Sequence, residues 1–225
     1  MRLIWGYPAA PARVRIGERE VSLYTVPDLE QLVDRGALLR GEAEPPYWAH
    51  LWPGARVLAQ YVDRWLDVRG RRVLELGCGL GLTGLVAALG GADVVCVDQV
   101  PAALGFVAAS AAANGVSCAC VCADFHTLAA EARFDFVLAA EVAYDRPRFG
   151  ALAEVIVRHL APGGSALLTD GYRVDTRALY GELGARGCAT HAVDLAVVEE
   201  GRRAPVRLVA VGCPTPPARA GASWG

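Results

Sequence analysis

The amino-acid sequence predicts an α/β fold: a three-layer αβα sandwich around a mostly parallel sheet of seven strands, one of them antiparallel. Strand-like apolar runs alternate with helix-like segments between residues 54 and 185, which is the pattern of βα units in a parallel sheet. A glycine-rich turn follows the first apolar run. Two last strand-like runs, 191–198 and 205–211, flank a polar turn and predict a terminal hairpin that supplies the antiparallel strand.

Three segments divide the chain. Residues 1–53 are expected to form an N-terminal extension with an aromatic loop that packs on the core. Residues 54–212 hold the main α/β domain, and residues 213–225, rich in Pro, Ala and Gly, are expected to be a mobile tail. A length of 225 residues suits one substantial hydrophobic core.

Each expected element follows from local pattern. In the extension, apolar spacing predicts two short strands and a helix that Asp28 caps. Pro101 is placed to open a later helix. The expected elements are strands 14–17 and 20–26, helices 28–38 and 54–65, strand 73–76, helix 82–89, strand 94–97, helix 101–113, strands 117–123 and 134–139, helix 147–160, strand 166–169, helix 175–185 and the terminal hairpin.

Charge and hydropathy exclude several partners. The chain contains no lysine, so all 22 basic residues are arginine, and the formal net charge is −2. No basic stripe indicates nucleic-acid binding. No run of about 18 apolar residues predicts a membrane span, and the first residues do not resemble a secretion signal. We expect no nucleic-acid partner, no membrane partner and a cytoplasmic location.

The seven cysteines are odd in number, and several fall in strand-like runs. This favours reduced thiols over a disulfide framework. Cys118, Cys120 and Cys122 alternate along one expected strand. We interpret them as small buried hydrophobic residues on one face of that strand, not as a metal site.

The glycine turn at Gly77, Gly79 and Gly81 indicates where a ligand binds. Glycine tolerates positive φ and lets a ligand approach backbone amides. Asp98 closes the next expected strand, roughly 20 residues further on, where an acid accepts hydrogen bonds from ribose hydroxyls. A strand, a glycine turn, a helix and a second strand that ends on an acid make the sheet Rossmann-like and predict an adenosine-like cofactor.

The segment from Gly79 to Gly84 also fits the dinucleotide pattern G-x-G-x-x-G. Glu75, however, interrupts the apolar run two residues before Gly77, and a carboxylate there would repel a pyrophosphate. The same carboxylate would attract a ligand that carries an ammonium and a sulfonium. We therefore predict that Glu75 faces S-adenosylmethionine.

The motif E-L-G-C-G-L-G at 75–81 resembles the first motif of the seven-strand, class I S-adenosylmethionine-dependent methyltransferases. The segments P-P-Y-W-A-H-L-W-P-G and A-A-E-V-A-Y resemble the protein lysine methyltransferase family that includes the enzyme acting on electron-transfer flavoprotein. This resemblance covers about residues 45–171. It implies that an aromatic residue walls the cofactor and that the acid after strand 117–123 lies near adenine. The predicted cofactor-binding residues are Trp52, Glu75, Gly77, Cys78, Gly79, Gly81, Asp98, Gln99, Asp124, Phe125 and Ala140.

Two of these assignments stay open on the residues alone. Asp124 fits a helix cap equally well. The aromatic loop that holds Trp52 fits a structural plug as well as a wall for a cation, which gains from a π face.

Glu141 and Tyr144 follow strand 134–139 and are the predicted catalytic residues. An amine acceptor with a pKa of about 10.4 must lose its proton before it attacks a methyl group. A carboxylate at this place can orient an ammonium, and a hydroxyl can steady the neutral amine. The family pattern has aspartate where this chain has Glu141. The alternatives are a surface carboxylate and a packing tyrosine, and His50 and His126 are further candidates for a base.

The favoured function is S-adenosylmethionine-dependent N-methyl transfer, with a protein lysine as acceptor. The alternatives are transfer to a small-molecule amine or other metabolite, and a non-catalytic cofactor-binding interaction module. An N/D-P-P-Y motif is absent after strand 134–139, which weighs against amide and nucleobase acceptors. An oxidoreductase with a Tyr-x-x-x-Lys centre is excluded because the chain has no lysine.

Overall fold

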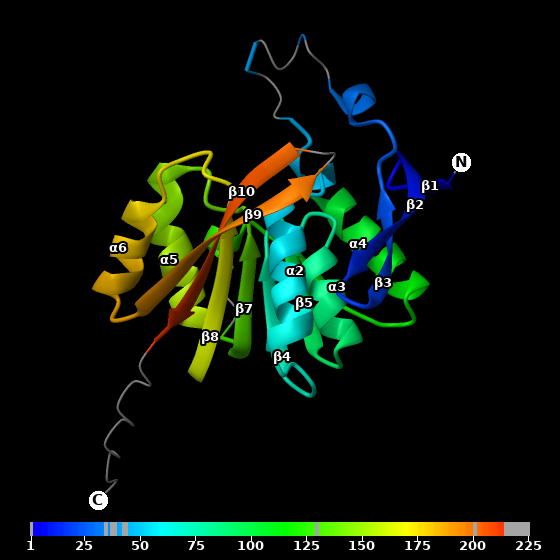
Figure 1. The fold of residues 1–225 in the computed structure, drawn as a ribbon. Coiled ribbons are helices and arrows are strands. Elements are labelled where there is room, and N and C mark those ends of the chain that lie inside the picture. The colour runs from blue at the N-terminus through cyan, green and yellow to red at the C-terminus, as the bar shows by residue number, and fades with distance from the viewer. Residues whose placement is uncertain are drawn as a thin grey trace, which may run out of the picture.

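A computed structural model describes residues 2–33, 36, 40–41, 45–128, 131–199 and 202–213. Its main sheet has seven strands in the order β6-β5-β4-β7-β8-β10-β9, as Figure 1 shows. Neighbours from β6 to β8 are parallel, and β10 is antiparallel to both β8 and β9. The predicted sheet is therefore confirmed. Its strands are β4 (Arg72–Leu76), β5 (Asp93–Asp98), β6 (Ala119–Cys122), β7 (Phe134–Ala140), β8 (Leu160–Asp170), β9 (Ala189–Glu199) and β10 (Arg202–Gly212).

Helices cover both faces of this sheet (Figure 1). Side chains of a strand alternate between the two faces. In β4, Val73 therefore packs in the apolar cluster of α2, α3 and α4, whereas Leu74 packs in that of α5 and α6. The helices are α2 (Pro53–Trp65), α3 (Leu82–Leu89), α4 (Pro101–Ala113), α5 (Phe149–His159) and α6 (Arg177–Ala185), and short 3-10 turns are η1 (Leu29–Leu32), η2 (Tyr47–Ala49), η3 (Phe125–Thr127) and η4 (Arg146–Arg148).

The order of the strands creates the place for a ligand. From β4 the chain moves outward through β5 to β6 and then returns to β7 on the other side of β4. Loops that leave β4 and β7 at their carboxyl ends therefore diverge, and in open α/β sheets ligands bind at such a switch point.

The N-terminal segment forms its own three-stranded antiparallel sheet, β1 (Arg2–Ile4), β2 (Tyr7–Ile16) and β3 (Arg19–Thr25). It lies beside α4 (Figure 1). The backbone amides of Ser22 and Tyr24 in β3 donate to Asn114 Oδ1 and Ser110 Oγ, both at 2.9 Å. The strand predicted for 20–26 agrees closely with β3, whereas β2 begins at Tyr7 and not at Val14 as predicted. β1 was missed because three residues hold too short a pattern.

The continuous helix predicted for 28–38 is wrong at its start, where a 3-10 turn, η1, ends after Leu32 and the backbone of Val33 is extended. There the turn η1 is capped by Asp28, whose Oδ1 accepts from the Glu30 amide at 3.0 Å; most of the remainder lies outside the described residues. The predicted tail also lies outside them, apart from Cys213. Among the described residues, no helix is long and apolar enough to cross a membrane.

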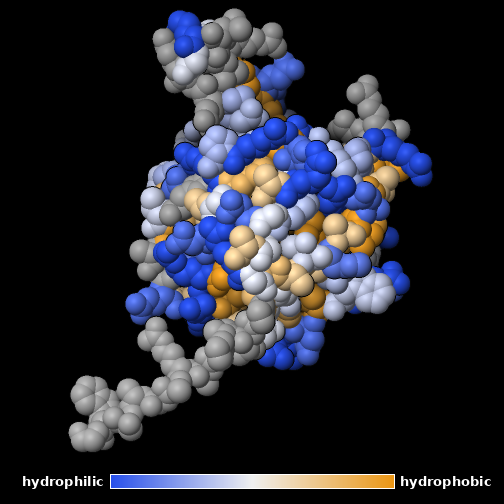
Figure 2. Space-filling model, turned by 90° about the vertical axis from the view of Figure 1, so that its left-hand side faces the viewer, coloured by the Kyte–Doolittle hydropathy of each residue, from blue (hydrophilic) through white to orange (hydrophobic). Residues whose placement is uncertain are grey.

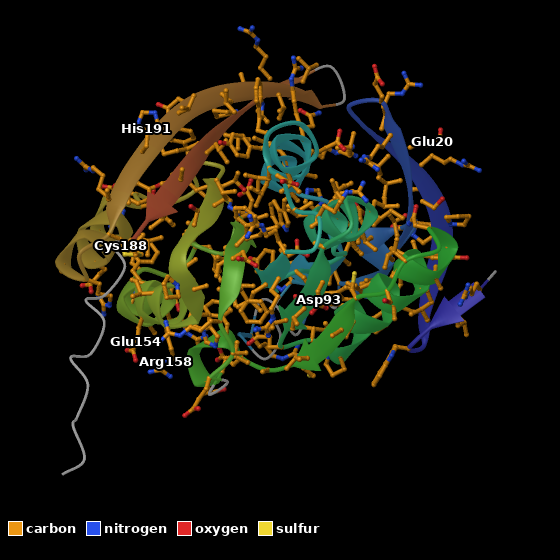
Figure 3. All side chains as sticks on the ribbon, turned by 90° about the horizontal axis from the view of Figure 1, so that it is seen from below. Glu20, Asp93, Glu154, Arg158, Cys188 and His191 are labelled. Atoms are coloured by element: carbon orange, nitrogen blue, oxygen red, sulfur yellow. A yellow bond between two sulfur atoms is a disulfide. The ribbon has the colours of Figure 1, made fainter. Side chains whose placement is uncertain are left out.

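Two expectations about the cysteines are wrong. Cys188 and Cys213 form a disulfide, because the β9–β10 register pairs Ala189 with Gly212 and so places the flanking cysteines opposite each other. Figure 3 labels Cys188 at the amino end of β9. Cys120 and Cys122 are exposed, not buried, since β6 is an edge strand.

The face that carries α6 shows hydrophilic and hydrophobic residues interspersed, without one dominant apolar patch (Figure 2). No group of three or more His, Cys, Asp or Glu side chains in the described ranges is arranged to hold a metal ion.

Candidate functional site

A cavity of about 300 Å³ lies at the carboxyl ends of β4, β5 and β7, at the switch point of the sheet. Residues 45–52 close it from the side of the N-terminal extension. With one exception, Glu75, every predicted site residue lines it. These residues are Trp52, Gly77, Cys78, Gly79, Gly81, Asp98, Gln99, Asp124, Phe125, Ala140, Glu141 and Tyr144.

The glycine turn has the geometry that its composition predicted. Gly77, Gly79 and Gly81 have φ of 59°, 52° and 74°, a region that L side chains avoid. A Cβ on Gly79 would also lie 3.0 Å from the backbone oxygen of Trp48. This glycine therefore lets the aromatic loop approach the turn and close one side of the cavity.

Asp98 at the end of β5 connects the turn to the next strand. Its Oδ2 accepts from the Gly79 amide at 2.8 Å, and its Oδ1 accepts from the Val100 amide at 2.9 Å. Burial raises the pKa of the Asp98 carboxyl, and the hydrogen bonds from Val100, Gly79 and Gln99 oppose that rise. A carboxylate with this anchoring keeps lone pairs that can accept from ligand hydroxyls.

Glu75 does not face the cavity, contrary to the prediction. Side chains alternate along β4, so Glu75 points to the same face as Val73, toward α3. Its Oε2 accepts from the Gly84 amide in the first turn of α3 at 2.9 Å, and the Cys96 thiol lies 3.7 Å away. Burial raises the pKa of Glu75 to about 7, although these hydrogen bonds lower it. The carboxyl group therefore caps a buried helix.

The outer end of the cavity carries an arginine that joins two acids. Arg148 Nη1 lies 3.4 Å from Asp124 Oδ2, and Arg148 Nε lies 3.3 Å from Asp145 Oδ2. Phe125 lines the cavity beside Asp124. Asp124 thus belongs to the cavity wall and to an ion pair, and it directly precedes the turn η3.

The aromatic loop forms the opposite wall. Trp52 precedes the first turn of α2, and its Nε1 donates to the Tyr47 backbone oxygen at 3.0 Å. The His50 ring centre is 4.4 Å from that of Trp52. Tyr47 also lies 6.3 Å, centre to centre, from the half-exposed ring of Tyr144. The loop therefore serves both as a packed plug and as part of the cavity wall.

Glu141 stands at the end of β7 with a φ of 59°, which is rare for a residue other than glycine. Its Oε1 accepts from the Gly54 amide at 3.0 Å, and its Oε2 lies 2.8 Å from Arg173 Nη2. Burial raises the pKa of Glu141, whereas the charge of Arg173 and the Gly54 hydrogen bond lower it. Its side chain is only 3% exposed, so it is not a surface carboxylate.

Several lining residues escaped sequence reasoning. The i, i+3 spacing of Asp145 and Arg148 is a signal that could have identified their ion pair. Trp48 of the aromatic loop lines the cavity but is not among the predicted cofactor-binding residues. His50 lines the cavity, whereas the side chain of His126 lies outside the described residues.

The residues fit a cationic adenosine derivative better than a diphosphate. The described lining residues include four acids and one arginine, so the formal net charge of the cavity wall is negative. The acids are Asp98, Asp124, Glu141 and Asp145, and the arginine is Arg148. A negative wall attracts a sulfonium and an ammonium. Gly77, Gly79 and Gly81 provide close backbone approach, and Asp98 and Asp124 line the same cavity.

Comparison with known proteins identifies a methyltransferase domain at residues 73–164. The chain is similar to the protein N-lysine methyltransferase METTL21A of Danio rerio, with 34% identity over 129 residues, 53% of this chain and 58% of that protein. It is also similar to the electron transfer flavoprotein beta subunit lysine methyltransferase of Mus musculus, with 30% identity over 102 residues, 44% of this chain and 40% of that protein. The chain spans about half the length of these relatives.

Solved structures share the fold. A Thermus thermophilus 16S rRNA N2 methyltransferase in complex with AdoMet and guanosine superposes with a TM-score of 0.66 at 21% identity, over 91% of this chain and 50% of that chain. At this identity the likeness shows the fold alone. The methyltransferase domain matched at residues 73–164, the seven-stranded sheet and the glycine turn make this chain similar to the class I S-adenosylmethionine-dependent methyltransferases.

Proposed function

We propose that this protein transfers a methyl group from S-adenosylmethionine to the side-chain amine of a protein lysine. The observation that carries the proposal is the convergence of Asp98, Asp124, Glu141 and Tyr144 on one cavity. The similarity to two protein lysine methyltransferases over about half of their length supports a lysine as acceptor.

The bound cofactor would supply an activated methyl group, so the protein's task is to orient and desolvate the acceptor. Asp98 and the glycine turn would hold the cofactor at the end of β5, with Asp124 and Phe125 at its adenine end. Trp52 and Tyr47 form an aromatic wall that suits a positively charged group.

Glu141 and Tyr144 would receive the acceptor. A carboxylate has about four lone-pair positions, so Glu141 can accept a further hydrogen bond from an ammonium beside those from Gly54 and Arg173. The Tyr144 hydroxyl would then steady the amine after proton loss. Its half-exposed ring lies where a side chain from another protein can reach it.

The test uses radiolabelled S-adenosylmethionine and a dialysed lysate as the acceptor pool. Label on a polypeptide is expected, and acid hydrolysis should release it as methyllysine. Glu141→Ala and Tyr144→Phe should reduce transfer, while Glu154→Ala, on the outer side of α5 (Figure 3), should not. Label on a small molecule would move the acceptor to a metabolite amine, and no transfer by the wild type would refute catalysis.

The cofactor is tested separately by isothermal titration. Heat with S-adenosylhomocysteine and none with NAD is expected, because the cavity wall is acidic. The reverse result would overturn the proposal at its first step.

We also propose that nucleic acid is not a methyl acceptor of this protein, since residues 141–144 lack the N/D-P-P-Y pattern. Free thiols at five cysteines support a cytoplasmic location, whereas the disulfide between Cys188 and Cys213 argues against it. Adding purified RNA to the labelling assay tests the first point. Alkylation of thiols at cell lysis, before purification, tests the second.

A further inference from the structure

Arg173, in the loop between β8 and α6, lies behind two residues of the cavity wall. Its guanidinium carbon is 4.0 Å from the centre of the Trp52 ring. Its Nη2 lies 2.8 Å from Glu141 Oε2 and donates to the Glu141 backbone oxygen at 3.1 Å. Trp52 and Glu141 line the cavity, whereas Arg173 is not among the described residues that do. One guanidinium thus joins the loop before α2 to the loop after β7 from the outside.

The remaining contacts of Glu141 leave its carboxylate little freedom. Its backbone amide donates to the Thr169 oxygen at 2.8 Å, and its Oε1 accepts from the Gly54 amide at 3.0 Å. A Cβ on Gly54 would lie 2.6 Å from the Glu141 Cγ, and one on Gly171 would lie 2.9 Å from its Oε2. The carboxylate is therefore enclosed by backbone, and Arg173 supplies its counter-charge.

The loop that carries Arg173 is itself held in place. Asp170 Oδ2 accepts from Thr176 Oγ1 at 2.9 Å and from the Tyr180 hydroxyl at 2.8 Å. Arg207 of β10 lies over the Tyr172 ring, 4.7 Å from its centre. Because both ends of the loop are anchored, Arg173 is presented to Glu141 in a fixed direction, as supporting residues of a functional site must be.

We propose that Arg173 is a positioning residue for the acceptor side of the site, which acts through Glu141 and Trp52 without touching the reacting atoms. This inference rests on the proposed function, because it assigns the acceptor to the wall that these two residues form. Removing the guanidinium would leave Glu141 buried without a cation and would release the Trp52 ring on one face.

The charges around Glu141 make this role measurable. Burial raises the pKa of Glu141, Arg173 and the Gly54 amide lower it, and the neighbouring Asp170 raises it. Without Arg173 the pKa of Glu141 rises further, so the carboxylate already becomes protonated at a higher pH. If the ionised form receives the acceptor, the acid limb of kcat/KM moves to higher pH in Arg173→Met.

The first experiment compares kinetic constants with the dialysed lysate as acceptor pool. Arg173→Met should lower the apparent kcat/KM for acceptor about 10²-fold, the scale for misplaced positioning groups, and Arg173→Lys should recover part of it. The double variant Arg173→Met with Glu141→Gln should lose much less than the product of the two single losses, because both changes act on one unit, and the remaining loss reports the contact with Trp52. The dissociation constant for S-adenosylhomocysteine should stay within about threefold, well below the tenfold change that 1.4 kcal/mol gives.

Arg64→Met is the matched control. The Arg64 guanidinium also lies over a tryptophan, 5.2 Å from the centre of the Trp65 ring, but at the far end of α2, and its loss should leave kcat/KM unchanged. If Arg173→Met matches this control in rate and in pH profile, Arg173 has no positioning role.

A second readout needs neither cofactor nor acceptor. A buried Glu141 without its cation destabilises the fold only when it is ionised, so the Tm deficit of Arg173→Met should grow as the pH rises from 5 to 8. The deficit should be independent of pH when Glu141 is already glutamine. A constant deficit in both backgrounds would overturn the coupling. If the wild type transfers no methyl group at all, the proposed function fails, and this thermal comparison still decides whether Arg173 controls Glu141.

Discussion

Glu75 Oε2 accepts a hydrogen bond from the Gly84 amide at 2.9 Å, which ties the end of β4 to the first turn of α3. A Cβ on Gly84 would lie 2.6 Å from that oxygen and 2.9 Å from the Cys96 sulfur. Glycine at this position therefore allows the buried carboxyl group to reach the helix. A residue that looked like a ligand contact in the sequence serves the scaffold beneath the glycine turn.

Replacing Glu75 by glutamine should change how stability depends on pH. The pKa of Glu75 is about 7 in the folded protein against 4.5 in the reference state. Between these values the unfolded chain releases the proton first, so wild-type stability falls as the pH rises, by about 3 kcal/mol. The difference in free energy of unfolding between Glu75→Gln and wild type should grow by this amount from pH 4.5 to pH 8. Urea denaturation measures this difference, and the same difference at both pH values would contradict the prediction.

Gly84→Ala should destabilise the protein by about 1–3 kcal/mol, because the added methyl group overpacks a buried contact. The control is Gly181→Ala in α6, where a Cβ meets no atom within 4 Å. That change should stabilise the helix by up to about 1 kcal/mol. Urea denaturation of both variants measures the contrast, and equal effects would show that α3 can move away from Glu75.

Asp98→Asn should weaken cofactor binding. Two backbone amides hold the carboxylate in place for the proposed hydrogen bonds from the ribose hydroxyls, and hydrogen bonds to a charged group contribute about 1.5–3 kcal/mol. We expect the dissociation constant for S-adenosylhomocysteine to rise at least tenfold in isothermal titration. Glu154→Gln removes a carboxylate that pairs with Arg158 on the surface of α5 and should bind as wild type does. Unchanged binding by Asp98→Asn would remove Asp98 from the ligand site.

Cys213→Ser should lower the free energy of unfolding of the oxidised protein by about 3 kcal/mol, because the disulfide closes a loop of 25 residues. Adding a thiol reductant should abolish the difference. Cys122→Ser, at an exposed free thiol, should have little effect in either condition. Equal stability of the oxidised wild type and Cys213→Ser would mean that the disulfide does not form in solution.

The sequence predicted the sheet and most of the cavity because both depend on local patterns. Apolar runs, the glycine turn and acids at strand ends are readable one segment at a time, and parallel strands bring their carboxyl ends together. The direction of Glu75 also follows from alternation along the strand, since Glu75 shares a face with Val73, although a carboxylate just before a glycine turn indicated a cationic ligand.

Other features depend on contacts between distant segments. Arg173 follows no motif, and only the anchored loop after β8 brings it to Glu141. Cys188 and Cys213 meet because of the register of β9 and β10, which composition does not reveal. The aromatic loop was expected to be either a packed plug or a wall, and its close approach to Gly79 depends on backbone geometry that the sequence does not show.

The hydrogen bonds from β3 to α4 have a consequence for self-association. Ser22 and Tyr24 direct their amides outward from the small sheet, and Asn114 and Ser110 already occupy both positions. At these two positions a strand from a neighbouring molecule would find both amides already paired. Ser110 of α4 and Asn114 at the end of that helix thus protect these positions of β3 from edge-to-edge aggregation.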